Sequence, residues 1–215
     1  REFGDVSSVS SPELPETLPF EATTNEKVEK SLKTITEELI SLKKELNEID
    51  EKVGDGDAGS TFAAGAKKIK ELIPQLPLDN SAELFISIGR ILARETGGSS
   101  GVLLSLMFTR AGNAYKENEH LGKALNEGLQ KMKEFGGAEE GQRTMIDALQ
   151  PAFKVLAEDG NLKTAAEKAR EGAEKTKKIT NTDFGRSSYL SEKSLKDIPD
   201  PGAEAVARVF EKLIG

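Results

Sequence analysis

The segment "DEKVGDGDAGST", residues 50–61, places three aspartates among three glycines. Asp55 and Asp57 occupy alternate positions of a loop, where side chains can point the same way, and Asp50 precedes them at the end of a helical pattern. Two carboxylates about 5 Å apart repel by about 1 kcal/mol in water, and by several times more where water is excluded. A hard cation removes that repulsion, and all-oxygen ligands suit Mg²⁺ or Ca²⁺. We therefore predict that Asp50, Asp55 and Asp57 are metal ligands.

An EF-hand and a helix-capping turn are the two other interpretations of this acidic segment. An EF-hand fails on spacing, because the twelfth position from Asp55 is Ala66, where a bidentate Glu is required, and the third from Asp50 is Lys52. The simpler alternative is a solvated acidic turn that caps the next helix. A cap does not need three aspartates separated by glycines, so the metal site is favoured.

Four glycine-rich junctions suggest that the same site holds phosphate. "DAGST" (57–61) and "GGSSG" (97–101) each open a helix, where free N–H groups and the helix dipole attract anions. "FGGAEEGQRTM" (135–145) is a third junction, and "FGRSSY" (184–189) places an arginine on a turn. A Walker A loop is absent, and so is the strand context of a GxGxxG site. Together the junctions predict a rim that holds cations and a polyphosphate.

Composition excludes several classes of chemistry and partner. The 215 residues contain no cysteine, which removes disulfides and thiolate chemistry, and the single histidine, His120, lies among charged residues and is expected to be solvated. Acidic residues outnumber basic ones by 37 to 30, which argues against nucleic acid or an anionic membrane as the main partner. No apolar run approaches the ~20 residues that span a bilayer. We expect an intracellular, cytoplasmic protein without a membrane span.

The elements that must position these loops are helices. Residues 1–24 are rich in Ser, Pro, Thr and Glu and are expected to be a flexible linker or tail, with a capping box of Thr23 and Glu26 at its end. From residue 25 the apolar residues follow a helical period. We expect helices over 26–50, 60–73, 80–95, 102–108 and beyond, 121–134, 143–158, 162–178 and after "PDPGA". "VLLSLMF" (102–108), apolar on every face, is expected to be central. The fold class is all-α, an antiparallel eight-helix bundle.

The chain from residue 25 to 215 resembles the nucleotide-binding (L) domain of dihydroxyacetone kinases. The resemblance rests on "DEKVGDGDAGST", "GGSSG", "GQRTMIDAL", "GRSSYL" and "PDPGA", in the family's order. It implies an eight-helix barrel with the nucleotide–Mg site in the loops at one end. It also implies two Mg²⁺ on Asp50, Asp55 and Asp57, bridging the phosphates of ATP or ADP.

The same resemblance assigns further residues to the nucleotide. Arg186 would approach the phosphates, as a catalytic as well as a binding residue together with the three aspartates. The other residues implied are Ala58, Gly59, Ser60, Thr61, Ser99 and Ser100 for the phosphates, Gly136, Thr144 and Met145 for the nucleoside, and Asp200, Pro201 and Gly202 for closure over the nucleotide. Gln142, where the family commonly has an acidic residue, departs from the pattern.

The resemblance also implies a function and leaves alternatives. The chain would be the ATP-binding half of a dihydroxyacetone (glycerone) kinase in glycerol metabolism. A separate domain would hold the ketose, and a homodimer would form through the full-length enzyme. A phosphotransferase-system subunit with ADP as a bound cofactor is one alternative, and a different acceptor or FAD cyclisation is another. The alternative from a different class is a non-catalytic helical interaction bundle that is stabilised by a metal.

Overall fold

The computed structural model describes residues 18–215, apart from the side chain of Arg186. Residues 1–17 lie outside this description, and most of the expected linker falls there. Leu18 packs against the core, and the Thr23 amide donates to the Leu76 carbonyl (3.2 Å). The expectation of a flexible tail therefore does not hold for residues 18–24, which lie against the bundle.

The described part of the chain is all-α, as predicted, and contains no strand beyond an isolated bridge between Thr23 and Pro77. Two short 3₁₀ helices, Ile73–Gln75 and Arg186–Tyr189, accompany ten α-helices. These are α1 (Glu26–Ser41), α2 (Lys43–Val53), α3 (Ala58–Leu72), α4 (Ser81–Glu95), α5 (Gly98–Asn118), α6 (Leu121–Gly136), α7 (Ile146–Glu158), α8 (Leu162–Thr176), α9 (Glu192–Leu195) and α10 (Pro201–Ile214).

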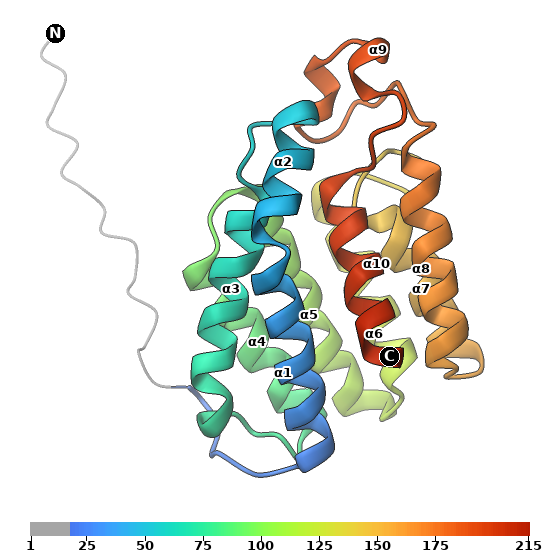
Figure 1. The fold of residues 1–215 in the computed structure, drawn as a ribbon. Coiled ribbons are helices and arrows are strands. Elements are labelled where there is room, and N and C mark those ends of the chain that lie inside the picture. The colour runs from blue at the N-terminus through green and yellow to red at the C-terminus, as the bar shows by residue number, and fades with distance from the viewer. Residues whose placement is uncertain (1–17) are drawn as a thin grey trace, which may run out of the picture.

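The long helices form a closed ring (Figure 1). Starting from α1, each packs against the next in the order α3, α4, α5, α6, α7, α8 and α10, and α10 returns to α1. The expected eight helices are thus the eight members of this ring. α2 prolongs α1 toward the end of the bundle where α9 lies (top of Figure 1).

The count differs from eight for two reasons. The first predicted helix is divided at Leu42, a single residue with a right-handed backbone (φ −75°, ψ −5°) that ends α1 and precedes α2. Leu42 and Leu46, on this second part, pack with Ala205 of α10. The four-residue α9 is too short to give a periodic pattern.

Three local predictions were wrong. Asn25, and not a Thr23–Glu26 box, caps α1 by accepting from the Val28 amide (3.2 Å). The helix predicted over residues 143–158 is α7, which begins only at Ile146. Arg143 has a left-handed backbone (φ 57°), which an α-helix cannot contain. α5 is a member of the ring and not a central helix, since it packs between α4 and α6, and Val102 at its start is 56% exposed.

Small residues bring α7 and α8 together. A stripe of alanines on α8 (Ala165, Ala166, Ala169 and Ala173) is fully buried, and Gly172 is buried on the same helix. A Cβ added to Gly172 would stand 1.9 Å from the carbonyl oxygen of Asp147 on α7. α8 also binds α10, because Arg170 forms hydrogen-bonded ion pairs with Glu204 (2.6 Å) and Glu211 (2.7 Å). These contacts fix the helices whose ends carry the site.

Candidate metal and nucleotide site

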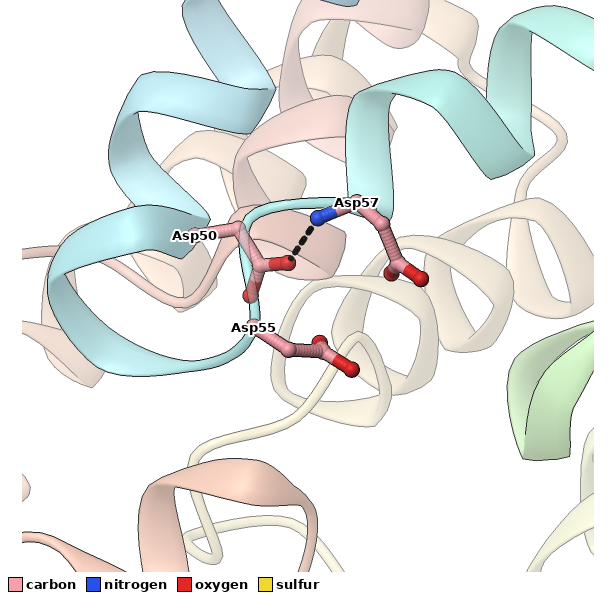
Figure 2. Close-up of side chains that lie close together, drawn as sticks. All are labelled: Asp50, Asp55 and Asp57. Atoms are coloured by element: carbon pink, nitrogen blue, oxygen red, sulfur yellow. Dashed lines mark hydrogen bonds between the residues drawn. The ribbon is translucent and has the colours of Figure 1, made fainter.

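The three predicted metal ligands converge at the junction of α2 and α3. Asp50 lies in the last turn of α2, Asp55 in the connecting loop and Asp57 at the N-cap of α3 (Figure 2). One carboxylate oxygen of each residue lies within 4.8 Å of the others. Asp50 is buried and the other two are exposed. This oxygen set fits a hard divalent cation that keeps part of its water shell.

Asp50 also builds the loop that carries the other two carboxylates. Its Oδ2 accepts hydrogen bonds from the backbone amides of Asp57 (2.9 Å) and Ala58 (3.0 Å), and Figure 2 shows the first of these. Its Oδ1 leaves no room for a side chain at Gly54, where a Cβ would lie 2.2 Å away. Glycine at position 54 is therefore required by the position of the Asp50 carboxylate.

The first turn of α3 is held by a residue that the sequence analysis did not assign. Asn47 of α2 accepts from the Ser60 amide (2.9 Å) and donates to the Ser60 hydroxyl (2.9 Å). Gly59 lies so close to α2 that a Cβ would stand 2.1 Å from the Lys43 carbonyl oxygen. The structure therefore turns Gly59 and Ser60 toward α2. The available signal was that Asn47 lies one turn before Asp50 on the same helix.

A cavity of about 850 Å³ joins the acidic loop to the other glycine-rich junctions. This volume lies within the range of small-molecule sites. Of the predicted site residues that the structure describes, Gly59 and Ser60 are not part of the cavity lining. The Arg186 side chain is outside this description. The predicted residues that line it are Asp50, Asp55, Asp57, Ala58, Thr61, Ser99, Ser100, Gly136, Thr144, Met145, Asp200, Pro201 and Gly202.

The cavity is bordered by a helix N-terminus and an apolar wall. Gly97 caps α5 without a side-chain hydrogen bond, and Gly97–Ser100 lines the cavity, which points the helix N-terminus at the site. α5 and α6 contribute Leu103, Leu106 and Phe135, and the last is 63% exposed. The apolar surface of α5 that suggested a central helix faces this cavity in part. A wall of this kind suits a flat heterocycle.

The loop before α7 is organised by a buried carboxylate. Asp147 accepts from the backbone amides of Gly141 (2.6 Å) and Thr144 (2.8 Å). Burial raises the pKa of Asp147, and the two amide hydrogen bonds lower it. Gln142 lies in this loop, where its side chain accepts from the Glu139 amide (2.5 Å). The loop thus holds its shape through its own backbone contacts.

The turn before α10 carries a second perturbed carboxylate. Asp200 caps α10 by accepting from the Ala203 amide (2.8 Å), and Pro201 occupies the first position of the helix. Burial raises the pKa of Asp200 to about 7, while the Ala203 amide and the charge of Arg143 lower it. Gly202 packs on Met145, whose Cβ would lie 3.1 Å from an added Cβ. The two predicted nucleoside and closure segments are therefore in contact.

The segment that carries Arg186 is anchored next to the acidic loop. The Ser187 hydroxyl donates to the backbone carbonyl of Val53 (2.9 Å), at the end of α2. Ser187 lines the cavity and is buried, although the sequence analysis assigned it no role.

His120 lies elsewhere, exposed at the N-cap of α6, where its Nδ1 accepts from the Lys123 amide (3.3 Å). The histidine is thus a helix cap in the structure.

Comparison with known proteins assigns the family. Residues 52–215 match the DAK2 domain family. The chain belongs to this family. It is 46% identical over 212 residues to a dihydroxyacetone kinase of Citrobacter freundii, covering 97% of this chain and 38% of that protein. It is also 35% identical to a triokinase/FMN cyclase of Mus musculus, covering 94% of this chain and 37% of that protein.

The fold agrees with a solved member of the family. The crystal structure of the Citrobacter freundii dihydroxyacetone kinase in complex with AMP-PNP and Mg²⁺ superimposes with a TM-score of 0.80 and 44% sequence identity. The match covers 98% of this chain and 37% of that one. The chain thus spans less than two fifths of the relatives it matches. In the part of this chain that the structure describes, no helix is both long and apolar enough to cross a membrane.

Proposed function

We propose that this chain is the ATP- and Mg²⁺-binding domain of a dihydroxyacetone (glycerone) kinase. It would transfer the γ-phosphoryl group of ATP to dihydroxyacetone held by a separate ketose-binding domain. The observation that carries the proposal is the convergence of Asp50, Asp55 and Asp57 at the edge of a nucleotide-sized cavity. The similarity to a dihydroxyacetone kinase that binds AMP-PNP and Mg²⁺ supports it.

The residues present fit two Mg²⁺ ions and a nucleotide. Asp50, Asp55 and Asp57 would hold the ions, which supply neutralising charge at the phosphates. Three carboxylates and a triphosphate carry a charge of about −7, which two Mg²⁺ reduce to about −3. Arg186 would reduce it further. The amides at the start of α5, with Ser99 and Ser100, would hold phosphate oxygens, and the apolar wall would receive the base.

The chain's own contribution to catalysis would be position and charge, because phosphoryl transfer needs no protein nucleophile. Asp50 would keep the acidic loop in place through its two amide contacts, so the carboxylates are arranged before the nucleotide arrives. Thr144, Met145 and the turn Asp200–Gly202 would hold the nucleoside. Gly59 and Ser60 would support this arrangement from behind, through Asn47.

Isothermal titration of ADP and ATP tests this proposal, with Mg²⁺ and then with EDTA. We expect one-to-one binding that depends on Mg²⁺. We also expect Asp55→Asn to abolish the Mg²⁺-dependent part while the helical circular dichroism spectrum is unchanged. Asp183→Asn, the same change at an exposed residue outside the cavity, is the matched control. Equal Mg²⁺-dependent affinity in wild type and Asp55→Asn would refute the metal assignment.

The same preparation separates the remaining alternatives. A nucleotide that survives dialysis and is released on denaturation would favour a phosphotransferase-system subunit with ADP as cofactor. A melting temperature raised by Mg²⁺ but not by nucleotide would favour a non-catalytic, metal-stabilised bundle. The mouse relative is named triokinase/FMN cyclase, so acceptor tests with the full-length enzyme should include other trioses and FAD.

A further inference from the structure

A buried arginine lies beneath the nucleotide cavity without a full set of partners. Arg143 is 1% exposed and lines the cavity. Its Nη1 donates to the backbone carbonyls of Thr176 (2.6 Å) and Ile179 (3.4 Å), at the end of α8. Its Nε and Nη2 have no hydrogen-bond partner among the residues described. Buried charged groups rarely lack hydrogen-bond partners, and this arginine therefore calls for a functional explanation.

Arg143 connects two segments of the proposed site that are distant in sequence. It lies in the loop that ends with Thr144 and Met145, and its backbone is held in the left-handed region (φ 57°). The Thr176 carbonyl accepts from Arg143, and the Thr176 hydroxyl accepts from the Asp200 amide (2.9 Å). A short chain of contacts therefore runs from the nucleoside loop through α8 to the closure turn.

The charges around the guanidinium point to the same two segments. Burial lowers the pKa of Arg143, and the negative charges of Asp200 and Asp147 raise it. Asp147 fixes the loop through the amides of Gly141 and Thr144, and Asp200 caps α10. The carboxyl groups whose charges act on Arg143 are therefore the ones that organise the segments it connects.

From these contacts we infer that Arg143 is a positioning residue. It holds the nucleoside loop, residues 136–145, against the closure turn, residues 200–202, so that both meet one nucleotide. The inference rests on the proposed function, because it assumes that a nucleotide occupies the cavity. Arg143 is 1% exposed and its Nη1 is bound to the Thr176 carbonyl, so its role is assigned to these two segments.

The test compares ADP binding in Mg²⁺ with Mn²⁺ binding in the absence of nucleotide. We expect Arg143→Met to weaken ADP by about tenfold or more, as is usual when an outer support of a site is removed. The ammonium of Arg143→Lys can still reach the Thr176 carbonyl, so this variant should recover part of the loss. Mn²⁺ affinity should stay within about twofold of wild type, because the aspartate loop is held separately by Asp50.

Hydrogen exchange identifies the segments affected. Arg143→Met should speed amide exchange in both residues 136–145 and 200–202. Thr176→Val, which removes the acceptor of the Asp200 amide and leaves the carbonyl, should speed exchange in the closure turn alone. Arg110→Met is the matched control, since Arg110 pairs with Glu127 between α5 and α6.

Two results would overturn the inference. The first is an ADP affinity in Arg143→Met equal to that of Arg110→Met. The second is a loss of Mn²⁺ affinity in Arg143→Met as large as its loss of ADP affinity, which would indicate general loosening of the fold. If Arg143→Met fails to fold, Arg143→Lys and Thr176→Val decide, and wild-type ADP affinity in both would refute the inference. Wild-type protein that binds no ADP would instead refute the proposed function.

Discussion

The carboxylates of Asp50, Asp55 and Asp57 lie close enough to repel one another. We therefore predict that removing one of these charges stabilises the metal-free protein. Asp57→Asn is the cleanest change. The Asp57 side chain is exposed and makes no capping hydrogen bond, and it is the Asp57 amide that bonds to Asp50. The substitution therefore removes one negative charge and, among the contacts of the described residues, leaves the structure of the loop in place.

The expected size follows from the separations. At 4.8 Å two unit charges in water repel by about 0.9 kcal/mol, and Asp57 has two such neighbours, Asp50 and Asp55. Screening at physiological ionic strength reduces the total to about 1 kcal/mol. The effect of Mg²⁺ has the opposite sign, since a ligand at 100 times its Kd adds about 2.7 kcal/mol to the folded state. The variant should lose most of that gain.

The stability order of wild type and variant should therefore reverse with metal. Urea unfolding in EDTA should show Asp57→Asn more stable than wild type, and unfolding in saturating Mg²⁺ should show it less stable. Asp183→Asn, measured in parallel, should follow wild type in both buffers. If Asp57→Asn were no more stable than wild type in EDTA, the carboxylates would not be repelling. If Mg²⁺ stabilised it as much as wild type, Asp57 would not be a ligand.

Three further changes test other parts of the structure. Burial raises the Asp200 pKa from 3.8 to about 7, so its stabilising contribution is complete below about pH 4 and is lost as the pH rises to 7. The difference in unfolding free energy between wild type and Asp200→Asn, in metal-free buffer, should change by up to about 1.4 kcal/mol per pH unit across that window, and a constant difference would contradict the assigned burial. Arg170→Met should lower the free energy of unfolding in urea by about 3 kcal/mol, because Glu204 is left buried without its partner, and a loss below about 1 kcal/mol would mean that solvent screens the pair. Gly172→Ala should cost about 2 kcal/mol in the same assay despite the better helix propensity of alanine, because its Cβ meets the Asp147 carbonyl, and unchanged stability would show that α7 and α8 can separate.

The sequence by itself determined the features that arise from neighbouring residues. The three aspartates lie within residues 50–57, so their types and spacing were enough to predict that they converge. The helices followed from apolar periodicity, and glycine-rich junctions marked where helices begin near the site. The resemblance to the family then predicted that residues 97–101, 135–145 and 200–202 meet at one site. In the structure, residues from all three segments line one cavity.

Only the tertiary structure decided the roles that depend on distant partners. Ser60 lies in a segment that was expected to hold phosphate, yet its amide and hydroxyl are bound to Asn47 on another helix. Arg143 lies in the motif "GQRTMIDAL", yet its burial against Thr176 follows from how α8 packs. The break at Leu42 keeps the helical period on both sides and therefore left no local signal. Such contacts join residues far apart in the chain, and packing selects them among many pairs of equal local propensity.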